Sequence, residues 1–146
     1  MAGTTIEQAL TDNKGELTQK VLRYSTIFKE VVSHAKEPGF SEASWAPLAE
    51  LVATDEFERV GAFKETMDWK TYIGFITQFA GMAQWNGFFR RVTEVPNLVI
   101  LGLEEHNTLN GHTDISNTVT IYEFNAAGKL RHLDVYLQRE QAGERG

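Results

Sequence analysis

A glutamate in an alternating run is the clearest candidate for acid/base chemistry in this sequence. In the expected strand Leu98–His106, Glu105 shares its face with the apolar Leu101 and Leu103, so we expect it to point inward. Its neighbour Glu104 then points to the opposite face, so one carboxylate of this pair can enter a pocket. A carboxylate in that position would accept or return a proton during a reaction.

A second carboxylate, Asp134, lies in the closing run Leu130–Leu137. It shares a face with His132 and lies opposite Leu133 and Val135, which we expect to meet the core. The outward face is either solvated or meets a second copy of the chain, and a β-bulge would instead rotate Asp134 inward. Asp134 is therefore an alternative acid or base.

Two further side chains offer hydrogen-bond donors and positive charge. Tyr24 lies within an apolar stripe at helical spacing, so its ring should point at the core. Its hydroxyl either bonds a backbone group or donates to a ligand.

Arg59, in a short strand expected at Asp55–Val60, is either a surface residue or a cavity residue. Inside a cavity its charge needs a partner, and we expect an ion pair with Glu105.

Three helices near the N-terminus are expected to position these residues. The first begins at about Gly15, and the second is a shorter helix with Ser44 as its N-cap and Pro47 in its first turn. The third runs from about Asp68 to Met82, where apolar residues follow helical spacing.

Strands follow the helices, since the apolar period changes to two. The turn Asn125–Gly128 requires a positive φ at Gly128, and Asn107–Asn117 is expected to be an irregular break. Helices followed by adjacent strands predict an α+β fold, with the helices on one face of a curved, mostly antiparallel sheet that encloses a pocket. The four expected strands are Phe88–Val95, Leu98–His106, Thr118–Phe124 and Leu130–Leu137.

Composition limits the domain count and the kinds of partner. The chain has 146 residues, no cysteine and a net charge of −6. We expect a disordered arm at 1–14, a single domain at 15–140 and a flexible tail at 141–146. The absence of cysteine favours the cytoplasm, and no signal peptide or membrane span is expected. No basic face is visible, so nucleic acid is not an expected partner.

Motifs for cofactors and metals are missing from the sequence. It contains no G-x-G-x-x-G, no P-loop and no G-x-S-x-G. The four histidines lack ligand spacing, so we expect neither a metal site nor a cofactor.

The helix order and the segment VTIYEFNAAGKLRHLDVYLQ resemble the nuclear transport factor 2-like (NTF2-like) superfamily. Its members include SnoaL-like cyclases, ketosteroid isomerases and limonene epoxide hydrolases. LAELVATDEFERVG and DWKTYIGFITQFAG also resemble family segments, so the likeness covers residues 15–140. It implies a cone formed by about three helices on a curved sheet, and members commonly dimerise through that sheet.

The resemblance places few known catalytic groups on this chain. VLRY resembles the helix motif of ketosteroid isomerases and puts Tyr24 at their tyrosine, but their base falls on Arg59 and their second acid on Thr120. The Asp–Arg–Asp set of the epoxide hydrolases falls on Leu103, Glu105 and Val135.

These observations predict a pocket for a small apolar or polycyclic ligand. The expected catalytic residues are Tyr24, Arg59, Glu105 and Asp134. The expected walls are Phe57, Tyr72, Phe75, Trp85, Leu103, Thr120, Val135 and Leu137. The leading hypothesis is a cofactor-free acid/base enzyme, namely a cyclase, isomerase, dehydratase or epoxide hydrolase. The alternatives are a non-catalytic ligand-binding module and a dimeric accessory protein that serves assembly.

Overall fold

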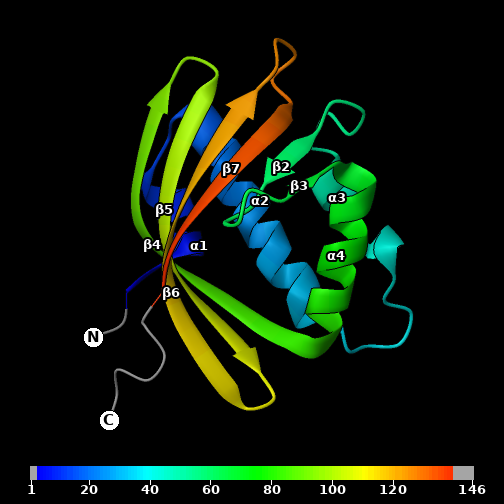
Figure 1. The fold of residues 1–146 in the computed structure, drawn as a ribbon. Coiled ribbons are helices and arrows are strands. Elements are labelled where there is room, and N and C mark those ends of the chain that lie inside the picture. The colour runs from blue at the N-terminus through cyan, green and yellow to red at the C-terminus, as the bar shows by residue number, and fades with distance from the viewer. Residues whose placement is uncertain (1–2, 140–146) are drawn as a thin grey trace.

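A curved sheet wrapped around helices dominates the computed structural model, which describes residues 3–139 (Figure 1). The strands are β1 (Thr4–Thr5), β2 (Glu58–Val60), β3 (Thr66–Met67), β4 (Ala83–Val95), β5 (Leu98–Leu109), β6 (His112–Phe124) and β7 (Leu130–Arg139). The helices are α1 (Ile6–Asp12), α2 (Glu16–Ser33), the 3₁₀ helix η1 (Glu42–Trp45), α3 (Ala46–Ala49) and α4 (Trp69–Met82).

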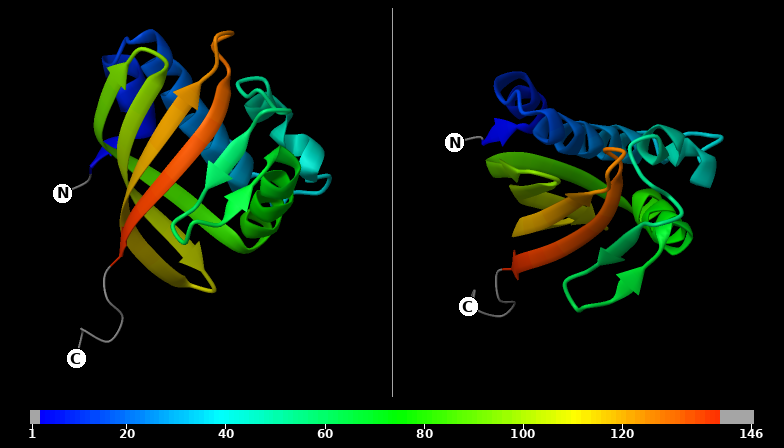
Figure 2. Two further views of the ribbon diagram at one scale, coloured as in Figure 1. Left: turned by 45° about the horizontal axis from the view of Figure 1, so that its top comes forward. Right: turned by 90° about the horizontal axis from the view of Figure 1, so that it is seen from above.

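The strands form one seven-stranded sheet in the order β1-β4-β5-β6-β7-β2-β3. Strands β4 to β7 pair antiparallel with their sequence neighbours, whereas β2 pairs parallel with β7 and places Arg59 opposite Leu133. Figure 2 shows the sheet curving around α2, with α4 and the β2–β3 hairpin along its open side. The expected α+β cone, with helices packed on a curved and mostly antiparallel sheet, is confirmed.

Two of the expected helices and the closing turn are confirmed. Helix α2 starts at Glu16, and α4 starts after Asp68, whose side chain accepts a hydrogen bond from the Thr71 backbone N–H. The β6–β7 turn closes at Gly128 with φ of 77°. A residue with a Cβ would be strained at that φ, so glycine fixes the turn.

The short helical region between α2 and α4 begins earlier than expected. Ser41, rather than Ser44, is the N-cap, and its side chain accepts from the Ala43 backbone N–H. The Ser44 hydroxyl in turn accepts from the Ser41 backbone N–H. The prediction placed the cap one turn too late because both serines belong to one capping box.

The hairpin formed by β5 and β6 is much longer than expected. The segment Asn107–Asn117 is not an irregular break, because both strands continue to a tight turn at Asn110 and Gly111. Those two residues have φ of 52° and 77°, as a two-residue Asn-Gly hairpin turn requires. Strand β4 also begins at Ala83 rather than Phe88, which places Trp85 within the sheet.

Residues 4–12 are ordered, which differs from the expected disordered arm. The Thr5 side chain caps α1 by accepting from the Gln8 backbone N–H, and β1 pairs with β4. Ile6 and Ala9 are fully buried in the core. The prediction failed because three apolar positions, Ile6, Ala9 and Leu10, are too few to form a recognisable stripe. The expected tail at 141–146 lies outside the described residues.

The core fills the space between the helices and the inner face of the sheet. One hydrophobic cluster runs from Ile6 to Leu133. Trp45, Leu48 and Leu101 are almost completely buried in it. Within residues 3–139, no helix is both long and apolar enough to cross a membrane.

Candidate functional site

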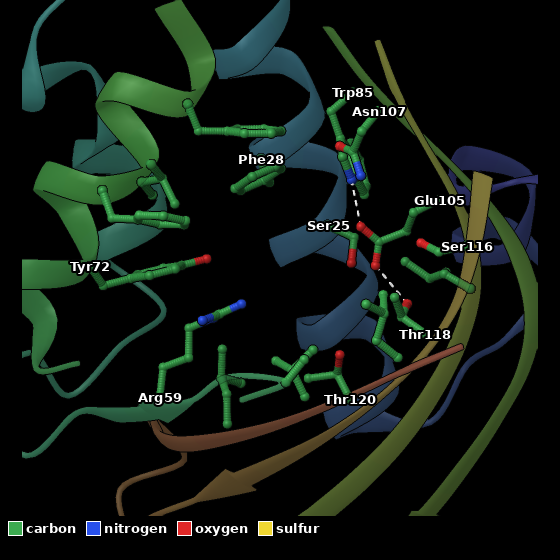
Figure 3. A pocket seen from close by; sticks show the side chains of 18 of the residues that line it. Ser25, Phe28, Arg59, Tyr72, Trp85, Glu105, Asn107, Ser116, Thr118 and Thr120 are labelled. Atoms are coloured by element: carbon green, nitrogen blue, oxygen red, sulfur yellow. Dashed lines mark hydrogen bonds between the residues drawn. The ribbon is translucent and has the colours of Figure 1, made fainter. Parts of the chain in front are cut away.

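A cavity of about 290 Å³ lies between the inner face of the sheet, α2, α4 and the β2–β3 hairpin. Figure 3 shows aromatic and apolar side chains on the helix side and polar groups along the sheet side. Most of the predicted site residues line this cavity: Tyr24, Arg59, Tyr72, Phe75, Trp85, Leu103, Glu105, Thr120, Val135 and Leu137.

Glu105 points into the cavity, as its place in the alternating strand predicted. Trp85 Nε1 donates to Glu105 Oε1, and Thr118 Oγ1 donates to Glu105 Oε2, each at 2.6 Å (Figure 3). Trp85 comes from β4 and Thr118 from β6, the strands on either side of β5. Each carboxylate oxygen keeps a free lone pair, so Glu105 is held in one orientation and can still accept a proton.

Three buried tyrosines from different elements line the cavity: Tyr24 on α2, Tyr72 on α4 and Tyr122 on β6. Tyr24 donates to the Tyr72 hydroxyl over 3.4 Å, so its hydroxyl is not bonded to the backbone. This bond leaves the Tyr72 hydrogen available, and Figure 3 shows the Tyr72 hydroxyl pointing into the cavity. Burial raises the pKa of all three phenols, which therefore remain neutral donors at physiological pH.

Arg59 lies on the wall opposite Glu105 (Figure 3). Its side chain is 18% exposed, its guanidinium lies 5.3 Å from the centre of the Tyr72 ring, and Nη1 is 3.9 Å from a Glu65 oxygen. The prediction of an ion pair between Arg59 and Glu105 is wrong. Pairing of β2 with β7 holds Arg59 on one wall, while Trp85 and Thr118 hold Glu105 on the other.

No protein-family model matches this chain, and no curated relative does. Solved structures do match. One described as a SnoaL-like polyketide cyclase, from Shewanella putrefaciens, has a TM-score of 0.66 at 9% identity over 90% of this chain and 85% of that one. An NTF2-like protein of unknown function from Burkholderia xenovorans has a TM-score of 0.57 at 18% identity over 90% and 94%. An LEH-like epoxide hydrolase from M. tuberculosis has a TM-score of 0.57 at 7% identity over 77% of this chain and 84% of that one.

This chain has the NTF2-like fold. The identities are low, so the likeness extends to the architecture and not to an activity.

Two predicted site residues lie outside the cavity of this NTF2-like fold. Asp134 is on the outer face of β7, where it is 3.0 Å from His132 Nε2, and His132 Nδ1 is 3.2 Å from Glu58. The bulge between β6 and β7 lies at Glu123 and Phe124, before Asp134, and does not turn it inward. Asp134 therefore cannot act on a ligand in this cavity.

The second such residue is Phe57, which was predicted to form part of the cavity wall. It is buried behind the cavity wall, with its ring centre 5.7 Å from that of Tyr72 and 5.1 Å from that of Trp69. It belongs to the core and supports Tyr72 rather than meeting a ligand.

Several cavity residues were missed from the sequence, above all polar ones on the extended hairpin. Asn107 lies two residues beyond Glu105 on the same face of β5, and its buried Oδ1 has no hydrogen-bond partner. Ser116 and Thr118 face the cavity from β6. Alternation would have indicated Asn107 and Ser116 if the strands had been extended to the Asn-Gly turn. Thr118 lies within the expected strand, two residues before the predicted wall residue Thr120, and was overlooked.

Across residues 3–139, no three histidine, aspartate or glutamate side chains come together in a way that could hold a metal ion.

Proposed function

We propose that this protein is a cofactor-free acid/base enzyme that acts on a small, largely apolar metabolite by isomerisation, cyclisation, dehydration or epoxide opening. The observation that carries this proposal is the position of Glu105. It is a carboxylate oriented by two hydrogen bonds and faces a cationic and phenolic wall across an apolar cavity.

Each wall has its own role in the proposed reaction. Glu105 removes a proton from the substrate and later returns it or delivers it to a leaving group. Arg59 and Tyr72 stabilise the negative charge on the substrate oxygen at the opposite wall. The apolar residues between them exclude water, which strengthens both electrostatic interactions.

The structural neighbours support this class of chemistry without selecting one reaction. One matching structure is described as a polyketide cyclase and another as an epoxide hydrolase. The Asp–Arg–Asp set of the epoxide hydrolases falls on Leu103, Glu105 and Val135 here, which favours cyclisation, isomerisation or dehydration over epoxide opening.

The proposal is tested by replacing Glu105 with glutamine, which keeps the size of the side chain but removes its basicity. The assay follows deuterium uptake next to the carbonyl in a panel of cyclic ketones and enones, by NMR in D₂O, together with diol formation from epoxides. Glu105→Gln should lower turnover by about 10²- to 10⁴-fold. Glu104→Gln is the matched control, because Glu104 is adjacent on β5 and contacts His106 at 2.8 Å rather than lining the cavity.

Equal turnover by the Glu105→Gln variant and the wild type would refute the acid/base role. Ligand binding without any turnover in the wild type would instead support the non-catalytic binding module.

We also propose that the protein acts as a homodimer that associates through the outer face of the sheet. Val119 and Tyr136 lie opposite each other on β6 and β7 and are 37% and 59% exposed. Ile115 adds a third apolar side chain on β6, at 49% exposure. The absence of cysteine suits the reducing cytoplasm, which is the compartment we propose.

A further inference from the structure

We propose that the ligand of this cavity is a compact hydroxy acid. It has an apolar body of one or two rings, a carboxylate at the end that meets Arg59, and a hydroxyl at the end that meets Glu105 and Asn107. The inference rests on the proposed function in that it takes the same cavity as the substrate site. It concerns which molecule binds and does not depend on what reaction follows.

Two acceptors at the sheet end of the cavity are available to a ligand, the Glu105 carboxylate and Asn107 Oδ1. The Trp85 N–H and the Thr118 hydroxyl hydrogen are both engaged by Glu105. Asn107 Oδ1 is buried and has no partner within the described residues. A buried acceptor without a partner costs free energy, and a ligand hydroxyl that donates its one hydrogen to Asn107 Oδ1, beside Glu105, would remove that cost.

The opposite end offers donors and an incompletely paired charge. A guanidinium has five N–H donors, yet the Arg59 side chain makes no hydrogen bond with any residue in the range 3–139. Its nearest carboxylate belongs to Glu65, at 3.9 Å and 43% exposed. The Tyr72 hydroxyl points into the same space (Figure 3). A ligand carboxylate fits here because its two oxygens match the planar fork of arginine and can also accept from Tyr72.

The middle of the cavity limits the size of the ligand. Phe28, Phe79 and Ile76 form the helix wall, and Leu103 and Val135 face them from the sheet. The volume of about 290 Å³ is at the lower end of the range for small-molecule sites. Of the two ligands expected from the sequence, small apolar or polycyclic, this volume favours the smaller.

Isothermal titration with four probes of one shape tests the inference. They are 6-hydroxy-2-naphthoate, 2-naphthoate, 6-methoxy-2-naphthoate and 2-naphthol. We expect the hydroxy acid to bind most tightly. Loss of the hydroxyl, its methylation or loss of the carboxylate should each weaken binding about 10-fold or more, because each leaves a protein group unpaired.

Three variants assign the two ends of the ligand. Arg59→Met should abolish the preference for 6-hydroxy-2-naphthoate over 2-naphthol, and Asn107→Leu should reduce its preference over the methoxy probe. Glu65→Gln should tighten binding of the carboxylates, since it removes a competing anion from Arg59. Arg23→Met is the matched control, because Arg23 is exposed on α2 outside the cavity. If Arg59→Met does not fold, Arg59→Lys keeps the charge and should lower the carboxylate preference through loss of the fork.

Equal binding of the four probes, binding of none of them, or an unchanged preference in the Arg59 and Asn107 variants would overturn the inference. Its failure can be distinguished from failure of the proposed function. Turnover of neutral ketones that depends on Glu105, together with equal binding of the four probes, would leave the acid/base enzyme standing while excluding a hydroxy acid. Selective binding of the hydroxy acid without turnover of any substrate would support the inference and count against the acid/base enzyme.

Discussion

At the scale of single residues, the two hydroxyls between helices α2 and α4 have unequal roles. Tyr24 donates to Tyr72, so the Tyr72 hydrogen is the one left for a ligand. Burial raises the pKa of both phenols, and the neighbouring Arg59 charge partly offsets this rise at Tyr72. Both groups therefore stay protonated well beyond neutral pH.

This arrangement predicts unequal effects of removing each hydroxyl. Tyr72→Phe should lower turnover by about 10²-fold, as expected for loss of a direct donor to developing negative charge. Tyr24→Phe should lower it about 10-fold or less, because Tyr24 acts through Tyr72 as a positioning residue. Steady-state kinetics between pH 6 and 9 would measure both, and neither variant should move the pH profile, since both phenols remain protonated there.

Tyr136→Phe is the control for this pair, because that exposed hydroxyl lies on the outer face of β7. A larger effect of Tyr24→Phe than of Tyr72→Phe would contradict the order of donation along the pair.

Residue faces were predictable from the sequence, whereas partners were not. Alternation placed Glu105 inward and Val135 on the inner face of β7. It does not say how far apart two inward side chains lie across a cavity, and so the Arg59–Glu105 pair was predicted wrongly. The bonds from Trp85 and Thr118 depend on the register between strands, which the sequence does not state.

At the scale of elements, the start of α2 depends on a strand distant in sequence. Its N-cap is Gly15, which has no side chain to satisfy the first backbone N–H groups. Glu94 from β4 supplies the missing acceptor, with bonds of 2.8 Å from the Thr18 backbone N–H and 2.7 Å from Thr18 Oγ1. A third bond, from the Leu17 N–H, is 3.4 Å long. These bonds lower the pKa of Glu94.

Replacing Glu94 with glutamine should therefore destabilise the protein by about 1 kcal/mol at pH 7, the usual cost of losing a helix cap. A carboxylate with a lowered pKa stabilises the fold above its unfolded pKa, near 4.5, and this contribution is lost as the pH falls through the folded value. Urea unfolding from pH 7 to 3.5 should show the two proteins converging at acid pH. Glu30→Gln, an exposed site on the same helix, serves as the control.

A constant difference between the wild type and Glu94→Gln at every pH would show that the charge of Glu94 does not act as the cap.

The elements that escaped prediction did so for a reason connected with the site. In the part of β5 and β6 that was expected to be irregular, the inward positions include Asn107 and Ser116, which face the cavity. Polar residues inside a cavity remove the apolar alternation that marks a strand, so the hairpin looked irregular. Helices α2 and α4 face the packed core along most of their length and kept the pattern that identified them.

At the scale of the whole molecule, the two faces of the sheet have different environments. The inner face encloses the cavity and the core, while the outer face carries exposed apolar side chains at Ile115, Val119 and Tyr136. Val119 lies opposite Tyr136 on one side and Gly102 on the other, and the alkyl part of the Arg91 side chain covers Gly102. A second copy could cover such a face with the same residues, as two-fold symmetry requires.

A charge placed at the centre of this face should separate the proposed dimer. Val119→Lys would bring two lysines together near the symmetry axis and bury them without partners, so the dissociation constant should rise about 100-fold or more. Light scattering after size exclusion, from 1 to 100 µM as the approximate range of a moderate dimer, would measure it. Met82→Lys is the control, because Met82 is 63% exposed at the end of α4 and does not belong to strands β6 and β7. A wild-type protein that is monomeric over this range, or a Val119→Lys dimer of unchanged affinity, would exclude the outer face as the interface. The cavity would then have to work within a single chain, which its enclosure by α2, α4 and the inner sheet already permits.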